Sequence, residues 1–326
     1  MQSCKGLLIN IFVKGMTFHS LFHSINSIKH HQREAFFMKE KIVYVLATLV
    51  LVPLNVLAKD MNSGIQNPVS DKVIKLQRTH LAKNTQGKGF GPQSPRDIDS
   101  NFGTNGVSFA SAPPSSKMNL CNIHFHKNAE HKGGEFTTYA GNGDGRGYQS
   151  GYKYSGKLTK TELSPIDHKI CPSKHGGLKV GDTIEVHYVH SSAQVKPGPT
   201  LGACLNDSIK NPQLRVETQV YVLVNNGNAL DFGKLTQFAE KNGYQQALNI
   251  PTNTGKPIQY SGSTTGPGYN EKGSPFQVTW SVRPKVAKVN IDSVGKFCEA
   301  NVFKEDHAHG VRNLVINPKL ISKIDN

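Results

Sequence analysis

Residues 122–126 read Asn-Ile-His-Phe-His, and residues 183–190 read Thr-Ile-Glu-Val-His-Tyr-Val-His. Both stretches show the alternation that predicts a β-strand, whose successive side chains point to opposite faces. In the first strand, Asn122, His124 and His126 therefore share one face, while the apolar residues between them face a core. The pattern predicts a sheet that carries two imidazoles side by side.

The second stretch supplies a third imidazole. The same parity places Glu185, His187 and Val189 on one face and turns His190 to the other. If the two strands pair, His187 lies beside the histidines of the first strand. Three neutral imidazoles with an open tetrahedral position are typical of catalytic zinc, which lowers the pKa of bound water from about 15.7 to about 7. The predicted ligands of one Zn²⁺ per chain are His124, His126 and His187.

Polar residues flank these histidines. Asn122 and Glu185 each lie two positions before a histidine of the same face, as suits acceptors that fix imidazole tautomers. Imidazole sites accept several divalent ions, so Co²⁺ or Cd²⁺ can replace Zn²⁺. An exposed sheet face with chance histidines would have the same pattern. A second motif, His307-Ala308-His309, lies outside any strand pattern and is expected in a surface loop.

Strand patterns of this kind recur along the chain. With 31 Gly, 17 Pro and 37% hydrophobic residues, the composition favours a β-rich class. Residues 231–242 and 293–301 are expected to form short helices. The expected strands are residues 121–126, 183–190, 216–224 and 276–282. We predict one mostly β domain with a few short helices.

The first part of the chain has the pattern of a secretory signal peptide. A basic stretch, residues 39–41, precedes the apolar run of residues 42–57, and Val56-Leu57-Ala58 gives a small-residue cleavage pattern. A membrane anchor is the alternative, although a run this short is more often cleaved. We expect an exported protein, periplasmic or secreted, with no stable membrane span after cleavage. The expected segments are an upstream extension (1–37), a signal peptide (38–58), an irregular exposed leader (59–88) and a catalytic domain (89–326).

Cysteine usage agrees with export. Of five cysteines, Cys4 precedes the signal peptide, and the other four allow two disulfides in three connectivities. Cys121 is expected to face the core with Ile123 and Phe125. The favoured pairs are Cys171 with Cys204, which flank one strand, and Cys121 with Cys298. A cysteine zinc site is the alternative, but no Cys-x-x-Cys motif occurs.

The formal net charge of +15 raises the question of nucleic acid. The basic residues form no dense block and show no interleaving with aromatic residues, so no nucleic-acid partner is expected. The charge is interpreted as favouring solubility or attraction to anionic envelope surfaces. The oligomeric state does not follow from the sequence.

The ordered set of motifs resembles the α-type carbonic anhydrases. Residues 122–126 and 184–190 resemble their HFHW and ELHLVH zinc-binding strands, and residues 93–99 (QSPRDID) resemble their QSPVDI segment. Residues 260–267 (YSGSTTGP) are similar to YPGSLTTPP, and VTW follows at 278–280. The resemblance spans roughly residues 89–301. It implies a single domain built around a large, twisted, mainly antiparallel sheet.

Departures from the α pattern favour a subclass. Only three residues separate His126 from Glu130-His131, where the α class has a longer insertion. The compact form, with Ser191-Ser192 and the segment 306–312, resembles the delta class of carbonic anhydrases. The chain is therefore interpreted as delta-like, with the α class as the close alternative.

The resemblance implies roles for individual residues. Glu130 and Thr265 would form the gate that aligns zinc-bound hydroxide for attack on CO₂, and an ungapped count from Tyr260 selects Thr265. Because the α-class shuttle histidine has no counterpart here, His131 or His190 would carry the proton. The residues that would shape the apolar wall for CO₂ are Val189, Val220 and Trp280.

The implied function is a zinc-dependent carbonic anhydrase, a lyase that hydrates CO₂ reversibly to bicarbonate and a proton. Anions and sulfonamides are the expected inhibitors. The alternative is a non-catalytic carbonic-anhydrase-related protein that binds zinc, or an envelope protein that buffers metal and also uses His307 and His309.

Overall fold

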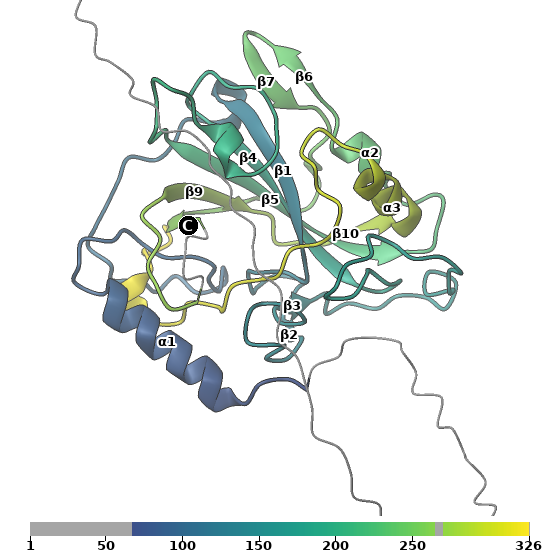
Figure 1. Cartoon of the computed structure of the whole chain (residues 1–326), viewed down its shortest axis with the longest axis horizontal. Coiled ribbons are helices and arrows are strands. Elements are labelled where there is room, and N and C mark those ends of the chain that lie inside the picture. Colours follow the sequence, from purple (N-terminus) through teal and green to yellow (C-terminus); the bar gives the residue numbers. More distant parts are fainter. Residues whose placement is uncertain (1–66, 265–269, 326) are drawn as a thin grey trace, which may run out of the picture. The chain divides into compact units, whose positions relative to one another are not determined.

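A six-stranded sheet forms the centre of the structure (Figure 1). The computed structural model describes residues 67–264 and 270–325. Five strands follow one another in the order β1-β4-β5-β9-β8, and β10 also pairs with β5. The strands are β1 (Asn119–Lys127), β4 (Thr183–Ser191), β5 (Leu214–Val224), β8 (Ile258–Ser263), β9 (Gln277–Val282) and β10 (Ala287–Asn290). The predicted mostly β class is confirmed.

The sheet is mixed. β1, β4 and β5 pair antiparallel, as do β8 and β9, so most neighbours are antiparallel as predicted. β9 and β10 both run parallel to β5. β9 pairs with residues 214–218 of β5, and β10 pairs with residues 221–224. The long strand β5 therefore pairs with both β9 and β10 along the same edge.

Smaller elements surround this sheet. Two hairpin sheets pair β2 (Thr138–Tyr139) with β3 (Tyr152–Lys153) and β6 (Phe238–Lys241) with β7 (Tyr244–Ala247). The helices are α1 (Asp71–Thr85), α2 (Phe232–Leu235) and α3 (Ile291–Glu299), with 3₁₀ turns at Ser115–Lys117, Leu201–Cys204 and Pro318–Leu320. Among the described residues, no helix is both long enough and apolar enough to cross a membrane.

The expected helix at residues 231–242 is wrong beyond its first turn. Asp231 caps α2 by accepting a hydrogen bond from the Lys234 N–H, but the helix ends at Leu235 and β6 begins at Phe238. Asn242 and Gly243 follow with φ of 53° and 79°. An Asn-Gly pair with positive φ is the preferred two-residue hairpin turn. The hairpin β6–β7 therefore replaces the second half of the expected helix.

The segment expected to be an irregular leader contains α1. Leu81 of α1 is 4% exposed and packs against Val315, Leu320 and Ile321 near the other end of the described chain. The Arg78 side chain donates to the Leu314 carbonyl at 3.2 Å. These contacts explain the helix, because its own sequence is polar and tertiary packing supplies most helix stability. The expected presequence segments, residues 1–58, lie outside the described residues.

The sheet has an apolar cluster on each face. Ile123 and Phe125 pack in one cluster with Phe232 of α2 and Phe297 of α3. Val189 and Trp280 pack in the other. This separation confirms the alternation predicted for β1 after residue 121.

Cys121 is an exception to that alternation. It packs in the cluster with Val189, whereas its neighbour Leu120 packs with Ile123. The pairing register of β1 with β4 shifts between Leu120 and Asn122. A bulge of this kind inserts an extra residue and redirects the side chains around it. The expectation that Cys121 shares a face with Ile123 is therefore wrong.

The bulge also explains why both favoured disulfide pairs are wrong. Cys121 is bonded to Cys204, and Cys171 to Cys298. Cys121 faces the cluster that contains Cys204, at the end of the 3₁₀ turn Leu201–Cys204. Cys171 packs in the opposite cluster, against which Cys298 of α3 is packed. In each favoured pair, Cys171 with Cys204 and Cys121 with Cys298, the two cysteines therefore lie on opposite faces of the sheet.

Peptide mapping of the unreduced protein is expected to recover Cys121 linked to Cys204 and Cys171 linked to Cys298. Replacing both Cys171 and Cys298 with Ser should lower the free energy of unfolding by about 2–5 kcal/mol, because this bridge closes a long loop. Urea unfolding of the variant and the wild type measures the difference. Recovery of a peptide linking Cys171 to Cys204 would contradict the assignment.

Candidate metal centre

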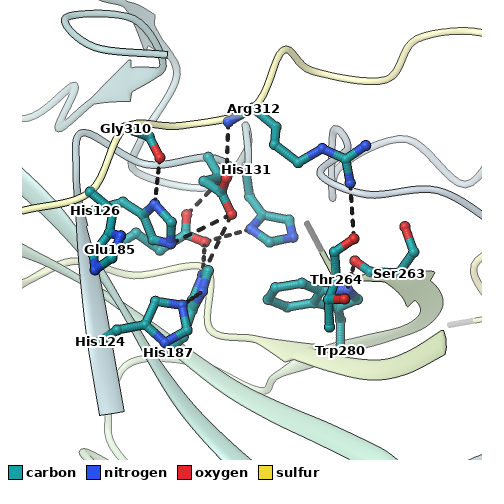
Figure 2. Close-up of polar contacts among 12 residues, drawn as sticks. His124, His126, His131, Glu185, His187, Ser263, Thr264, Trp280, Gly310 and Arg312 are labelled. Atoms are coloured by element: carbon teal, nitrogen blue, oxygen red, sulfur yellow. Dashed lines mark hydrogen bonds and ion pairs between the residues drawn. The ribbon is translucent and has the colours of Figure 1, made fainter. Parts of the chain in front are cut away.

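The pairing of β1 with β4 brings three histidines together (Figure 2). His124 lies directly opposite His187 in the antiparallel register, and His126 lies opposite Glu185. The ring centroids of His187 are 5.0 Å from those of His124 and 4.7 Å from those of His126. One nitrogen from each of the three lies within 4.8 Å of the others. The cross-strand arrangement inferred from the sequence is present.

Each histidine has one ring nitrogen fixed by an oxygen acceptor. His124 Nδ1 lies 2.6 Å from Asn122 Oδ1, and His187 Nε2 lies 2.7 Å from Glu185 Oε1. His126 Nδ1 lies 2.8 Å from the main-chain oxygen of Gly310. These oxygens accept hydrogen bonds, so the facing nitrogens carry the protons. The remaining nitrogens, His124 Nε2, His126 Nε2 and His187 Nδ1, keep their lone pairs.

These remaining nitrogens fit a cation. His126 Nε2 is buried and has no hydrogen-bond partner among the described residues, which is unusual for a buried polar atom. His187 Nδ1 and His124 Nε2 are 3.2 Å apart. With both outer nitrogens protonated, two lone pairs face each other across that distance. A divalent ion satisfies all three, and three imidazole nitrogens are a typical zinc donor set.

Burial keeps two of the imidazoles neutral. It lowers the pKa of His126 to about 4, helped by the nearby His187 and His309 and opposed by the charge of Glu130. Burial, followed by the neighbouring histidines, holds the pKa of His124 well below 6.5. Neutral imidazole is the form that binds a metal.

Glu130 lies beside the histidines. Its side chain is buried, and Oε1 accepts a hydrogen bond of 2.9 Å from the Arg312 main-chain N–H. Oε2 lies 3.9 Å from His126 Nε2 and 4.0 Å from His187 Nε2. Its expected gate partner, Thr265, lies outside the described residues.

The two candidate proton carriers are enclosed. His131 is 0% exposed, and its ring nitrogens lie 2.7 Å from Glu185 Oε1 and 2.7 Å from the Tyr260 hydroxyl. His190 is 1% exposed and donates from Nδ1 to the Tyr188 carbonyl at 2.9 Å; by parity it shares a face of β4 with Val186 and Tyr188, which pack in the cluster that contains Ile123. A proton carrier must exchange with solvent, so these positions do not support the shuttle role expected of either residue. His131 instead helps to hold Glu185.

A pocket of about 340 Å³ opens over the histidines. Val189 and Trp280 line it, as expected, together with Val216 and Leu201. Val220 is not among the lining residues; it is fully buried in the cluster behind the pocket. Val216 lies four residues earlier on β5, nearer the pocket, and the wall expected at Val220 is corrected accordingly.

The segment 305–312 was not recognised as part of the site. His309, expected in a surface loop, lines the pocket, and its ring centroid lies 5.7 Å from those of His124 and His126. Burial lowers the pKa of His309, but the hydrogen bond and charge of Glu305 outweigh burial and raise the pKa overall. No periodic pattern marks this segment. The only available signal was the His-x-His motif itself.

The chain was compared with protein families and with curated proteins. The family model described as Delta carbonic anhydrase matches residues 115–293. No curated protein matches the chain.

Several solved structures are similar at low identity. An α-carbonic anhydrase from Thermovibrio ammonificans, in complex with the inhibitor sulfanilamide, is 16% identical over 68% of this chain and 82% of that chain, with a TM-score of 0.26. The α-carbonic anhydrase of Photobacterium profundum is 16% identical over 70% and 88%, with a TM-score of 0.25. A halotolerant carbonic anhydrase from Dunaliella salina is 16% identical over 77% and 96%, with a TM-score of 0.28. The family assignment depends on the family model alone.

The environment of His190 predicts a loss of stability in acid. Burial lowers the pKa of His190 from 6.5 to about 4, although its Nδ1–H donates to the Tyr188 carbonyl. Below pH 6.5 His190 is protonated in the unfolded chain, whereas in the folded protein it stays neutral until about pH 4. This group therefore stabilises the fold fully above pH 6.5, and up to about 3 kcal/mol is lost as the pH falls toward 4.

Urea unfolding at pH 7 and pH 4.5 tests this for the wild type and His190→Gln. The variant should lose less stability between the two pH values. His80→Gln is the control, because the His80 side chain is 41% exposed. Equal acid losses in the wild type and His190→Gln would contradict the prediction.

Proposed function

The chain belongs to the delta carbonic anhydrase family, and from this we propose that it catalyses the reversible hydration of CO₂ to bicarbonate and a proton. The observation that carries the proposal is the cluster of three histidine nitrogens within 4.8 Å of one another, of which the buried His126 Nε2 has no hydrogen-bond partner among the described residues. The residues proposed to hold one Zn²⁺ are His124, His126 and His187. Co²⁺ or Cd²⁺ is expected to bind the same donors.

A bound zinc ion would lower the pKa of its water to about 7 and so supply a nucleophile near neutral pH. The chain's own residues prepare the site for it. Asn122, Glu185 and the Gly310 carbonyl fix the ring orientations and tautomers of the ligands. His131 donates to Glu185 and thereby limits the orientations of that carboxylate.

Glu130 is proposed to orient the reacting oxygen through Thr265. The Arg312 N–H donates to Oε1 of Glu130, and Oε2 would accept a hydrogen bond from the hydroxyl of Thr265, which lies outside the described residues. The threonine oxygen would then accept a hydrogen bond from the O–H of the nucleophile and so direct the lone pair of the nucleophile toward carbon. Such positioning converts an encounter into an aligned reaction.

The pocket wall suits a small apolar substrate. Val189, Val216 and Trp280 line it beside the histidines, and Leu201 closes it on the side tethered by the Cys121–Cys204 disulfide. CO₂ carries no net charge or hydrogen, so apolar contact is the expected mode of binding. Anions and sulfonamides are the expected inhibitors of the same pocket.

We also propose that the protein is exported, periplasmic or secreted. Two disulfides in the described part of the chain support an oxidising compartment. The proposed signal peptide comprises residues 38–58, and the catalytic domain residues 89–326.

Metal binding should be visible through Trp280, the single tryptophan of the chain. Its ring centroid lies 5.0 Å from that of His187. Titration of chelator-treated protein with Co²⁺, which quenches nearby indole fluorescence, should saturate at one ion per chain. His126→Ala should weaken the affinity at least about 100-fold, because it removes a ligand.

His168→Ala is the matched control, because His168 is an exposed histidine paired with Asp167. Its titration should match that of the wild type. Unchanged fluorescence, or saturation only after several ions, would count against the site and favour the metal-buffering alternative.

Stopped-flow CO₂ hydration by the oxidised, zinc-loaded protein is the direct test of activity. His124→Ala should abolish hydration, and Glu130→Gln should reduce kcat about 100-fold, because the nucleophile loses its orientation. His307→Ala is the control, since His307 does not line the pocket. A folded wild type that binds one zinc but does not hydrate CO₂ would point to a non-catalytic relative.

A further inference from the structure

Residues 309–312 contact three separate parts of the candidate metal centre. The His309 N–H donates to the Phe125 carbonyl at 2.9 Å, and the Lys127 N–H donates to the His309 carbonyl at 3.0 Å. These bonds attach the segment to the end of β1, where the Gly310 carbonyl meets His126 Nδ1. Two residues later, Arg312 reaches the remaining parts of the site (Figure 2).

Arg312 makes two of these contacts through different groups. Its main-chain N–H donates to Glu130 Oε1 at 2.9 Å, and its Nη1 donates to the Thr264 carbonyl at 3.1 Å. Figure 2 shows the Arg312 side chain extending toward Thr264. Glu130 and Thr264 both line the pocket. One residue therefore spans the distance between the buried carboxylate and the end of β8.

The burial of this guanidinium requires an explanation. Arg312 is 3% exposed, and arginine is almost never fully buried without partners. Taking the cation out of water costs free energy unless its hydrogen bonds are satisfied. An apolar side chain of the same length would fill the space without that cost. The directed hydrogen bond to the Thr264 carbonyl is one of the contacts that offset this cost.

We propose that Arg312 is a positioning residue for CO₂ hydration. It holds the Glu130 carboxylate and the Thr264 carbonyl at a fixed separation, so that the pocket wall and the carboxylate keep their alignment over the three histidines. This inference rests on the proposed function. It assigns a role to a residue that lines the pocket but is not one of the three histidines proposed to hold the metal.

Arg312→Met removes the donor while keeping a long side chain. Because small misplacements of reacting groups can cost about 100-fold in rate, kcat per bound zinc should fall about 10- to 100-fold with little change in KM. Arg312→Lys retains a donor for the Thr264 carbonyl and should recover most of the loss. The affinity for sulfanilamide, measured by calorimetry, should weaken in Arg312→Met at unchanged zinc content.

Arg283→Met is the matched control. Arg283 also uses Nη1 to donate to carbonyl oxygens, those of Thr252 at 3.3 Å and Gly255 at 2.8 Å, but it does not line the pocket. Its loss should leave kcat and sulfanilamide affinity unchanged. If Arg312→Met does not fold, Arg312→Gln, measured in the same way, decides by the same criteria.

A double-mutant cycle separates positioning from general stability. If Arg312 acts through Glu130, Arg312→Met should reduce kcat far less in a Glu130→Gln background than in the wild type. Full additivity, or kcat per zinc and sulfanilamide affinity within twofold of the wild type, would overturn the inference. If the zinc-loaded wild type itself does not hydrate CO₂, the proposed function fails together with this inference. That outcome is recognised from the wild type alone, before any variant is compared.

Discussion

The register between β1 and β4 is the constraint on which the site depends. His124 faces His187, and His126 faces Glu185, because one antiparallel alignment sets both pairs. A slip of one residue would turn every side chain of a strand to the other face. The alternating apolar residues, among them Ile123 and Phe125, prevent this slip because they are buried against the helices on the opposite face. Core packing therefore fixes the positions of the polar donors.

The bulge at the start of β1 connects this register to the pocket. It turns Cys121 toward the pocket side, where the disulfide to Cys204 ties down the turn that carries Leu201. The same strand thus supplies two of the clustered histidines from its regular part and a covalent anchor for the pocket wall from its irregular part. Within the nine residues of β1, the regularly paired part and the bulge therefore serve different functions.

The sequence predicted what depends on local periodicity and missed what depends on contacts between distant segments. Parity placed His124, His126 and His187 on facing strands, and Asn122 and Glu185 beside them. Gly310 was missed because its carbonyl meets His126 across 184 positions, with no side chain to mark the contact. His309 and Arg312 lie in segments that the sequence analysis noted, but nothing in local periodicity placed them beside the histidines of β1 and β4.

The errors in the fold have specific local causes. The disulfide pairs were wrong because a bulge is invisible to a strict alternation, and the second half of the helix at 231–242 was wrong because the Asn242-Gly243 turn was not weighed. The helix α1 was missed because its stability comes from packing against residues 315–321. Val220 was assigned to the pocket because parity does not give the position along a strand.

The contact between His126 and Gly310 has a consequence for the order of assembly. During synthesis, β1 leaves the ribosome long before residue 310. β5 likewise leaves it before β9 and β10, the strands with which it pairs in parallel. Connections this distant close slowly, and intermediates with unpaired strand edges persist while they do. The imidazole cluster therefore reaches its final orientation only late in folding. Until residue 310 joins the fold, the His126 ring lacks the acceptor that fixes its orientation.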